Sequence, residues 1–179
     1  MKPTLTLSNL STPPQQRGMM LIEALMAILI FSLGILGMVG VNALAVASQS
    51  DAQYRTDANK FATQIINQIW VSVPRVPSIP GDPTSAPMIA AASLNAFQHQ
   101  ATTDANCSFS GDPATDAVVA PWVASVMAAG TGLPGATAAM QQIVVANTAS
   151  QLNEVTVTVC WKAPGDAVAR KHVMKSVIN

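Results

Sequence analysis

The chain has 179 residues, of which 50% are hydrophobic and 10% charged, and its nine basic and nine acidic residues leave no formal net charge. This length predicts one domain in addition to an apolar segment, or at most two small units. A balanced charge gives no support to a nucleic-acid partner or an acidic substrate. We therefore expect neither nucleic acid nor a small-molecule ligand among the partners.

Much of the hydrophobic excess lies between Met19 and Ala47, and residues 24–50 contain no Asp, Glu, Lys, Arg or His. About 20 apolar residues are enough to span a bilayer. Lys2 and Arg17 precede this stretch, and Asp51 is the first charged residue after it. This distribution predicts a single-pass inner-membrane protein with a cytoplasmic N-terminus and a periplasmic C-terminal part.

The chain's two cysteines, Cys107 and Cys160, both fall on the predicted outer side of the membrane. In an oxidising compartment they are expected to form one disulfide, and two buried thiols are the alternative. Closing a loop of about 50 residues contributes roughly 4 kcal/mol in the chain-entropy treatment.

Two ordinary explanations leave part of the N-terminal segment unexplained. A secretory signal peptide has an apolar core of about 7 to 15 residues and an A-x-A-like cleavage site, whereas this run is about twice as long and lacks the site. A plain membrane anchor fits the length but explains neither Arg17-Gly18 nor Glu23. An ionisable group beside lipid is costly and normally marks function.

The stretch Gly18-Met19-Met20-Leu21-Ile22-Glu23, with a basic leader before it and a long apolar helix after it, resembles a type IV prepilin signal. In that family a membrane-bound prepilin peptidase cuts after the glycine and methylates the new N-terminal amine. The resemblance implies that residues 1–18 are a leader, that cleavage separates Gly18 from Met19, and that Met19 is N-methylated. The family more often begins its mature chain with Phe, a position that tolerates other apolar residues.

Cleavage would give Glu23 a role, because it creates an α-amino group that is mostly protonated at pH 7. An ammonium and a carboxylate attract strongly in a low-dielectric medium, and leaving either unpaired is expensive. The family resemblance implies that Glu23 of an incoming subunit meets the N-terminus of a neighbour already in the filament. The hypothesis predicts that Glu23→Gln leaves membrane insertion intact and blocks incorporation into filaments.

The helix is expected to continue to about Trp70, with residues 19–50 as the transmembrane and assembly half and residues 51–72 as an amphipathic half. Apolar residues recur in the second half at spacings of three and four, which predicts one face covering a sheet. They are Tyr54, Ala58, Phe61, Ile65 and Ile69. In the first half, Gly34, Gly37 and Gly40 either permit close packing of membrane helices or weaken the helix locally.

Residues 73–179 are expected to form a periplasmic or extracellular head. Prolines three residues apart (Pro74, Pro77, Pro80 and Pro83) predict a stiff, polyproline-like connector, followed by a short helix over residues 88–98. Three aspartates, Asp104, Asp112 and Asp116, occur between residues 102 and 120. Their spacing matches no calcium motif, so we expect no metal.

Strands are expected near the C-terminus of the head. A helix over residues 121–127 and a turn at Leu133-Pro134-Gly135 precede strands at 142–146, 154–161 and 168–178. Residues 154–161 alternate strictly, which places Val155, Val157, Val159 and Trp161 on the face toward the helix. Cys160 then lies on the opposite face with Thr156 and Thr158. The predicted fold class is α+β: a pilin-like long N-terminal helix packed on a small antiparallel sheet of about three strands.

Several features together resemble the PilV family of minor pilins, from Gly18 onward. They are SLGILGMVG after the signal, a cysteine upstream of a Trp-containing short helix, an LPG turn and a VTVTVCW strand. A major pilin usually has its two cysteines close together near the C-terminus, unlike Cys107 and Cys160. The resemblance implies a minor pilin that joins other minor pilins and the major pilin in a complex that initiates or caps a type IV pilus. It also implies a final location in the pilus, at the tip.

Two other functions compete with this one. A minor pseudopilin of a type II secretion system shares signal and architecture, and neighbouring genes for minor pilins or for secretion would separate the two. For an enzyme, only His99 and His172 are available, neither in a metal-ligand spacing, and no G-x-S-x-G motif occurs. We therefore expect no catalysis and no cofactor. Both histidines are expected on the surface. Three basic residues near the C-terminus are expected on a charged outer strand: Arg170, Lys171 and Lys175.

Overall fold

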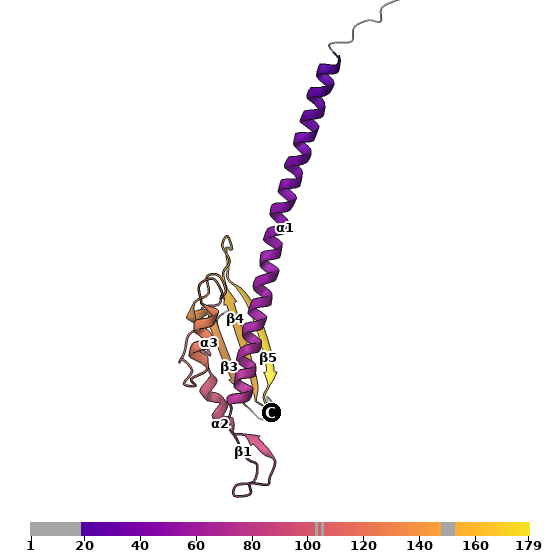
Figure 1. Cartoon of the computed structure of the whole chain (residues 1–179). Coiled ribbons are helices and arrows are strands. Elements are labelled where there is room, and N and C mark those ends of the chain that lie inside the picture. Colours follow the sequence, from indigo (N-terminus) through magenta and orange to yellow (C-terminus); the bar gives the residue numbers. More distant parts are fainter. Residues whose placement is uncertain (1–18, 103, 105, 148–152) are drawn as a thin grey trace, which may run out of the picture. The chain divides into compact units, whose positions relative to one another are not determined.

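The computed structural model describes residues 19–102, 104, 106–147 and 153–179. It divides into two compact units, the second of which is Ser50–Asn179, and helix α1 (Met19–Ser72) contributes to both. The predicted α+β layout is observed: a long apolar N-terminal helix packs, through its second part, on a small antiparallel sheet (Figure 1).

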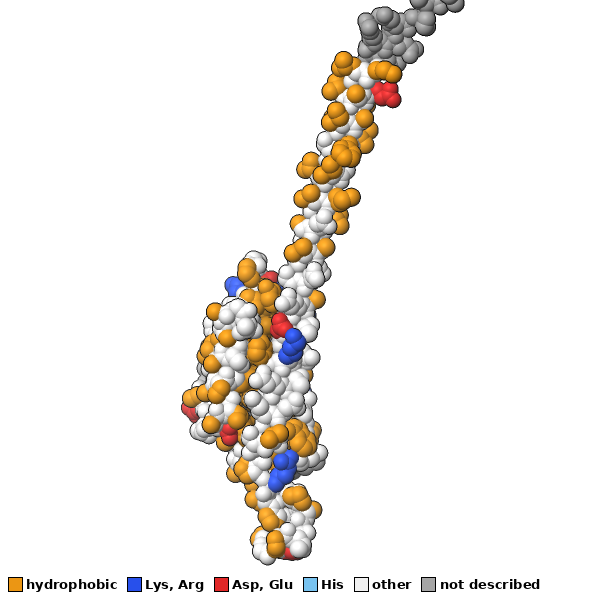
Figure 2. Space-filling model, viewed as in Figure 1, with side chains coloured by type: hydrophobic (Ala, Val, Ile, Leu, Met, Phe, Trp, Pro, Cys, Tyr) orange, Lys and Arg blue, Asp and Glu red, His pale blue; other side chains and the backbone are white. Residues whose placement is uncertain are grey.

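The first unit consists, in its described part, of α1 up to Gln49. Its side chains from Met20 to Gln49 are all exposed, and Figure 2 shows hydrophobic side chains along this part of the helix. An added Cβ at Gly34, Gly37 or Gly40 would meet nothing within 4 Å. This helix is long and apolar enough to cross a membrane, as predicted, and its apolar surface is left without protein cover in the described residues.

The second part of α1 changes to a one-sided burial pattern. Ala58, Ala62, Ile65 and Ile69 are fully buried, and the predicted Tyr54 and Phe61 pack against the same core. The helix ends at Ser72, immediately before the Val73-Pro74 pair, because a proline restricts the preceding residue and has no N–H to donate.

A cation lies at the C-terminal end of α1. The Arg75 guanidinium donates to the Trp70 carbonyl (3.2 Å) and lies over the indole ring, 5.4 Å from its centroid. A positive group is favourable at this end of a helix. Arg75 also donates to the Asn179 carbonyl (3.2 Å), so it joins the end of the helix to the end of the chain.

The predicted meander is present as one three-stranded antiparallel sheet. It contains β3 (Gln141–Ala146), β4 (Glu154–Trp161) and β5 (Arg170–Val177) in the order β3-β4-β5. Val157 of the central strand lies opposite Ile143 and Met174. As predicted, Val155, Val157, Val159 and Trp161 are buried in the core that contains the apolar face of α1.

The helix and the turn that precede β3 also contribute buried residues to the core. Helix α3 (Val119–Val126) places Trp122 in the interior, where its indole N–H donates to the Phe61 carbonyl of α1 (2.9 Å). The predicted turn follows, and Gly135 has φ +60° with the Lys162 carbonyl oxygen 2.5 Å from where a Cβ would stand. A side chain at residue 135 would clash with that backbone atom. A short 3-10 helix, η2 (Ala138–Met140), then leads into β3.

The proline-rich stretch is extended at residues 75–77, as predicted, but the prediction that it is a stiff connector is wrong. Residues 75–77 form β1 (Arg75–Pro77), which pairs antiparallel with β2 (Pro87–Ile89), so the stretch is a hairpin. The expected helix over residues 88–98 is shorter and begins later, as α2 (Ala91–Leu94) and the 3-10 helix η1 (Asn95–Phe97). The start of that helix was misplaced because residues 87–89 pair with β1.

Candidate functional site

Glu23 lies on α1, among apolar side chains that are exposed along the helix. It is itself exposed, and within the described residues no basic side chain forms an ion pair with it. A carboxylate in this position needs a partner from outside the described chain if its surroundings are hydrocarbon. The structure therefore leaves Glu23 available for a contact with another molecule.

The proposed cleavage point lies at the edge of the described structure. Met19 is the first residue of α1, and Gly18 falls outside the described residues. A chain beginning at Met19 would thus start with the helix, one turn ahead of Glu23.

The predicted disulfide between Cys107 and Cys160 is present, with a Cα–Cα distance of 6.0 Å. Both residues are buried, in a small cluster with Phe109. Because Cys160 belongs to the central strand β4, the bond fixes the Cys107 loop to the sheet. The loop side of the bond adopts φ +61° at Cys107.

The junction between the apolar and amphipathic parts of α1 carries an ion-pair network that the sequence pattern did not reveal. Asp51 accepts from Arg55 (3.1 Å) on the same helix and is also paired with Arg170 of β5. Arg170 donates to both carboxylate oxygens of Asp166 at 2.8 Å. This contact holds the pKa of Asp166 below its ordinary value and raises the pKa of Arg170.

The prediction that both histidines lie on the surface is wrong. His99 is buried, and its backbone exchanges two hydrogen bonds with Ile143 at the edge of β3 (2.9 and 3.0 Å). Its Nδ1 accepts from the Ala114 N–H (3.2 Å), and its Nε2 has no partner among the described residues. Desolvation lowers the pKa of His99. His172 is half-buried on β5.

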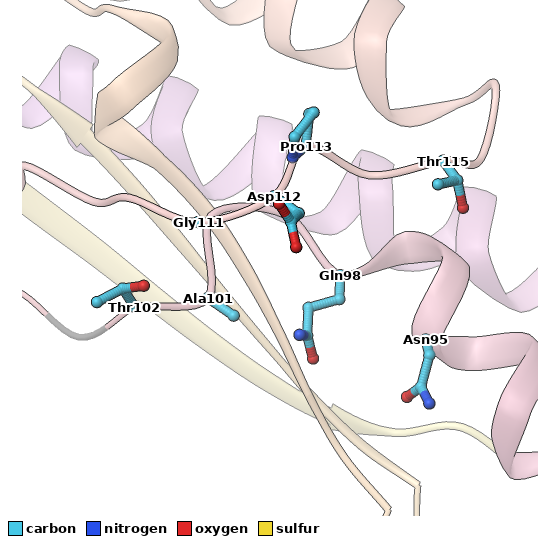
Figure 3. Close-up of a pocket in the computed structure, with 8 residues that line it drawn as sticks. All are labelled: Asn95, Gln98, Ala101, Thr102, Gly111, Asp112, Pro113 and Thr115. Atoms are coloured by element: carbon cyan, nitrogen blue, oxygen red, sulfur yellow. The ribbon is translucent and has the colours of Figure 1, made fainter.

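A shallow polar pocket of about 440 Å³ is lined by Asp112, the second of the three aspartates singled out in the sequence (Figure 3). The other polar side chains in its lining are those of Asn95, Gln98, Thr102 and Thr115. Asp116 instead accepts from the Val118 N–H at the start of α3 (3.0 Å). In the described part of the chain, no three His, Cys, Asp or Glu side chains are grouped so that they could hold a metal ion.

No protein-family model, no curated protein and no solved structure matches this chain.

Proposed function

We propose that this protein is a minor pilin of a type IV pilus. In this proposal the chain is held in the membrane as a precursor and is processed between Gly18 and Met19. It then joins other pilins in the complex that starts or caps the pilus. The observation that carries the proposal is α1. One helix has an apolar part, in which Glu23 is the single charged residue, and a second part that builds the core of an α+β head. A plain anchor needs neither Glu23 nor continuity with the core of the head.

The mechanism is assembly, without bond chemistry by the head. Lipid covers the apolar part of α1 until the helix enters a bundle of pilin helices, where neighbouring helices replace lipid. Glu23 selects the register of entry, because the carboxylate is costly unless it meets the methylated, protonated amine of an adjacent subunit. The topology that we propose has a cytoplasmic N-terminus and a periplasmic head, as the charges before and after the segment indicate.

The test is a Glu23→Gln variant in cells that make filaments, with Glu154→Gln as the matched control. Glu154 is a half-buried residue of β4 whose carboxylate pairs with the exposed Lys175 (2.7 Å), and the loss of such a pair costs about 1 kcal/mol. Removing one partner of a buried ion pair costs about 3 kcal/mol or more, which lowers incorporation by about a hundredfold.

We expect Glu23→Gln to enter the membrane and lose its leader like the wild type, while immunoblots of sheared filaments show it almost absent. Glu154→Gln should be incorporated normally. Normal incorporation of Glu23→Gln would contradict the proposed role of the carboxylate. Recovery of the wild-type chain in fibres of a type II secretion system, and never in pili, would instead make it a pseudopilin.

A further inference from the structure

We propose that the head carries a binding site for the phosphate groups of membrane lipids, in the pocket between α1 and the edge strand β5. The proposal rests on the membrane anchoring that is part of the proposed function. The pocket has a volume of about 310 Å³. Three residues of strands β4 and β5 and three residues of α1 line it: Trp161, Lys171, His172, Arg55, Thr56 and Asn59.

The pocket offers cations and amide donors to an anionic group. Arg55 has an exposed side chain, and Lys171 is exposed on β5 and has no ion-pair partner in the described part of the chain. Asn59 is exposed on the same stretch of α1, and no protein group in the described residues engages its amide. Phosphate oxygens accept strongly from such groups.

Two of the lining residues carry buried polar atoms without a partner. Trp161 is buried and His172 half-buried, and Trp161 Nε1 and His172 Nε2 lack a hydrogen-bond partner within the described ranges. Buried polar atoms are normally satisfied by protein or water, so a lining with these residues suits a polar guest better than an apolar one.

The charge around the pocket is net positive despite two nearby acids. Asp51 is already bonded to Arg55 and Arg170, and Asp166 is held by Arg170 through both oxygens. These two acids are outnumbered by Arg55, Arg170 and Lys171, so an arriving anion meets an excess of positive charge. An anionic lipid surface attracts each basic residue beside it.

Arg55 lies close along the chain to the end of the apolar stretch. The uncharged stretch of residues 24–50 is about 40 Å long at 1.5 Å per residue, close to the full bilayer thickness of about 40–45 Å with headgroups. Arg55 follows Ser50 by little more than one helical turn. Side chains on a helix lean toward its N-terminus, and the long stem of arginine or lysine lets the cation reach back to the headgroups.

The experiment uses the full chain in nanodiscs that contain phosphatidylcholine with phosphatidylglycerol, with a photo-crosslinking amino acid in place of Asn59. We expect mass spectrometry to find a lipid adduct at residue 59. The double variant Arg55→Gln/Lys171→Gln should lower the adduct yield at least about fivefold. The matched control Lys60→Gln/Lys175→Gln also removes two positive charges, but from residues that are paired with Asp57 and Glu154 outside the pocket. Its yield should stay unchanged.

Three results would overturn the assignment. They are an inserted chain without a lipid adduct, an equal loss of adduct in both double variants, and an adduct to a second copy of the chain. Loss of the adduct in millimolar inorganic phosphate would identify a site for free anions instead of lipid. A chain that fails to enter the nanodisc would contradict the membrane anchoring of the proposed function as well, whereas an inserted chain without an adduct would contradict the lipid site alone.

Discussion

Removing the Cys107–Cys160 bond is predicted to destabilise the head strongly. The two cysteines are 53 residues apart, and the chain-entropy treatment gives about 4 kcal/mol for closing a loop of that length. Whole domains are stable by only about 5–15 kcal/mol, so this loss is a large fraction of the total. The Cys107→Ala/Cys160→Ala variant should therefore unfold at a much lower urea concentration than the wild type.

The measurement is urea unfolding of the full chain in detergent micelles, followed by the fluorescence of the buried Trp122 and Trp161. Reduced wild-type protein is the control, because it lacks the cross-link but keeps both sulfur atoms. It should unfold near the double variant, which would assign the loss to the cross-link. A difference below about 1 kcal/mol between the oxidised wild type and the double variant would refute the loop-closure reasoning.

Two more predictions concern single buried side chains. Trp122→Phe removes the indole N–H that donates to the Phe61 carbonyl, and urea unfolding should show that the free energy of unfolding falls by about 1 kcal/mol. The control Trp70→Phe, at an exposed position, should change the free energy of unfolding by less than about 0.5 kcal/mol. Equal effects of the two variants would contradict the role of this hydrogen bond. The pKa of His99 is lowered in the folded protein, so folding favours the neutral imidazole. The contribution of His99 to the free energy of unfolding is therefore fully present above pH 6.5, and it is lost as the pH falls from 6.5 toward the lower pKa of the folded state. Protonation of Nδ1 would also remove the acceptor for the Ala114 N–H. The free energy of unfolding of His99→Gln, measured by urea unfolding at several pH values, should therefore lack the decrease that His99 causes below pH 6.5. Identical pH profiles for the variant and the wild type would contradict this role of His99.

Local patterns predicted the parts of the fold that depend on one segment at a time. Strand β4 was predicted with its observed bounds, because a strict alternation of apolar and polar residues is typical of a strand. The amphipathic part of α1 was predicted from its spacing for the same reason, as residues three and four apart share a face.

The errors arose where distant segments decide the structure. Residues 75–77 are extended as predicted, but they become a strand only because residues 87–89 pair with them, and those residues were assigned to a helix. His99 is buried because its backbone pairs with Ile143, an edge contact that no local pattern indicates.

The two candidate sites differ in the same respect, because one lies within a single segment and the other is formed by distant segments. Glu23 stands out in the sequence because it is a charge in an apolar stretch. The pocket of Arg55 and Lys171 does not, because it joins α1 to a strand more than a hundred residues later.

The most direct test of the central claim is mass spectrometry of the N-terminus of this protein in filaments sheared from cells. We expect a chain that begins at Met19, carries a methyl group on its α-amine and retains the Cys107–Cys160 bond. A chain that still carries residues 1–18 and occurs only in membranes would contradict this claim.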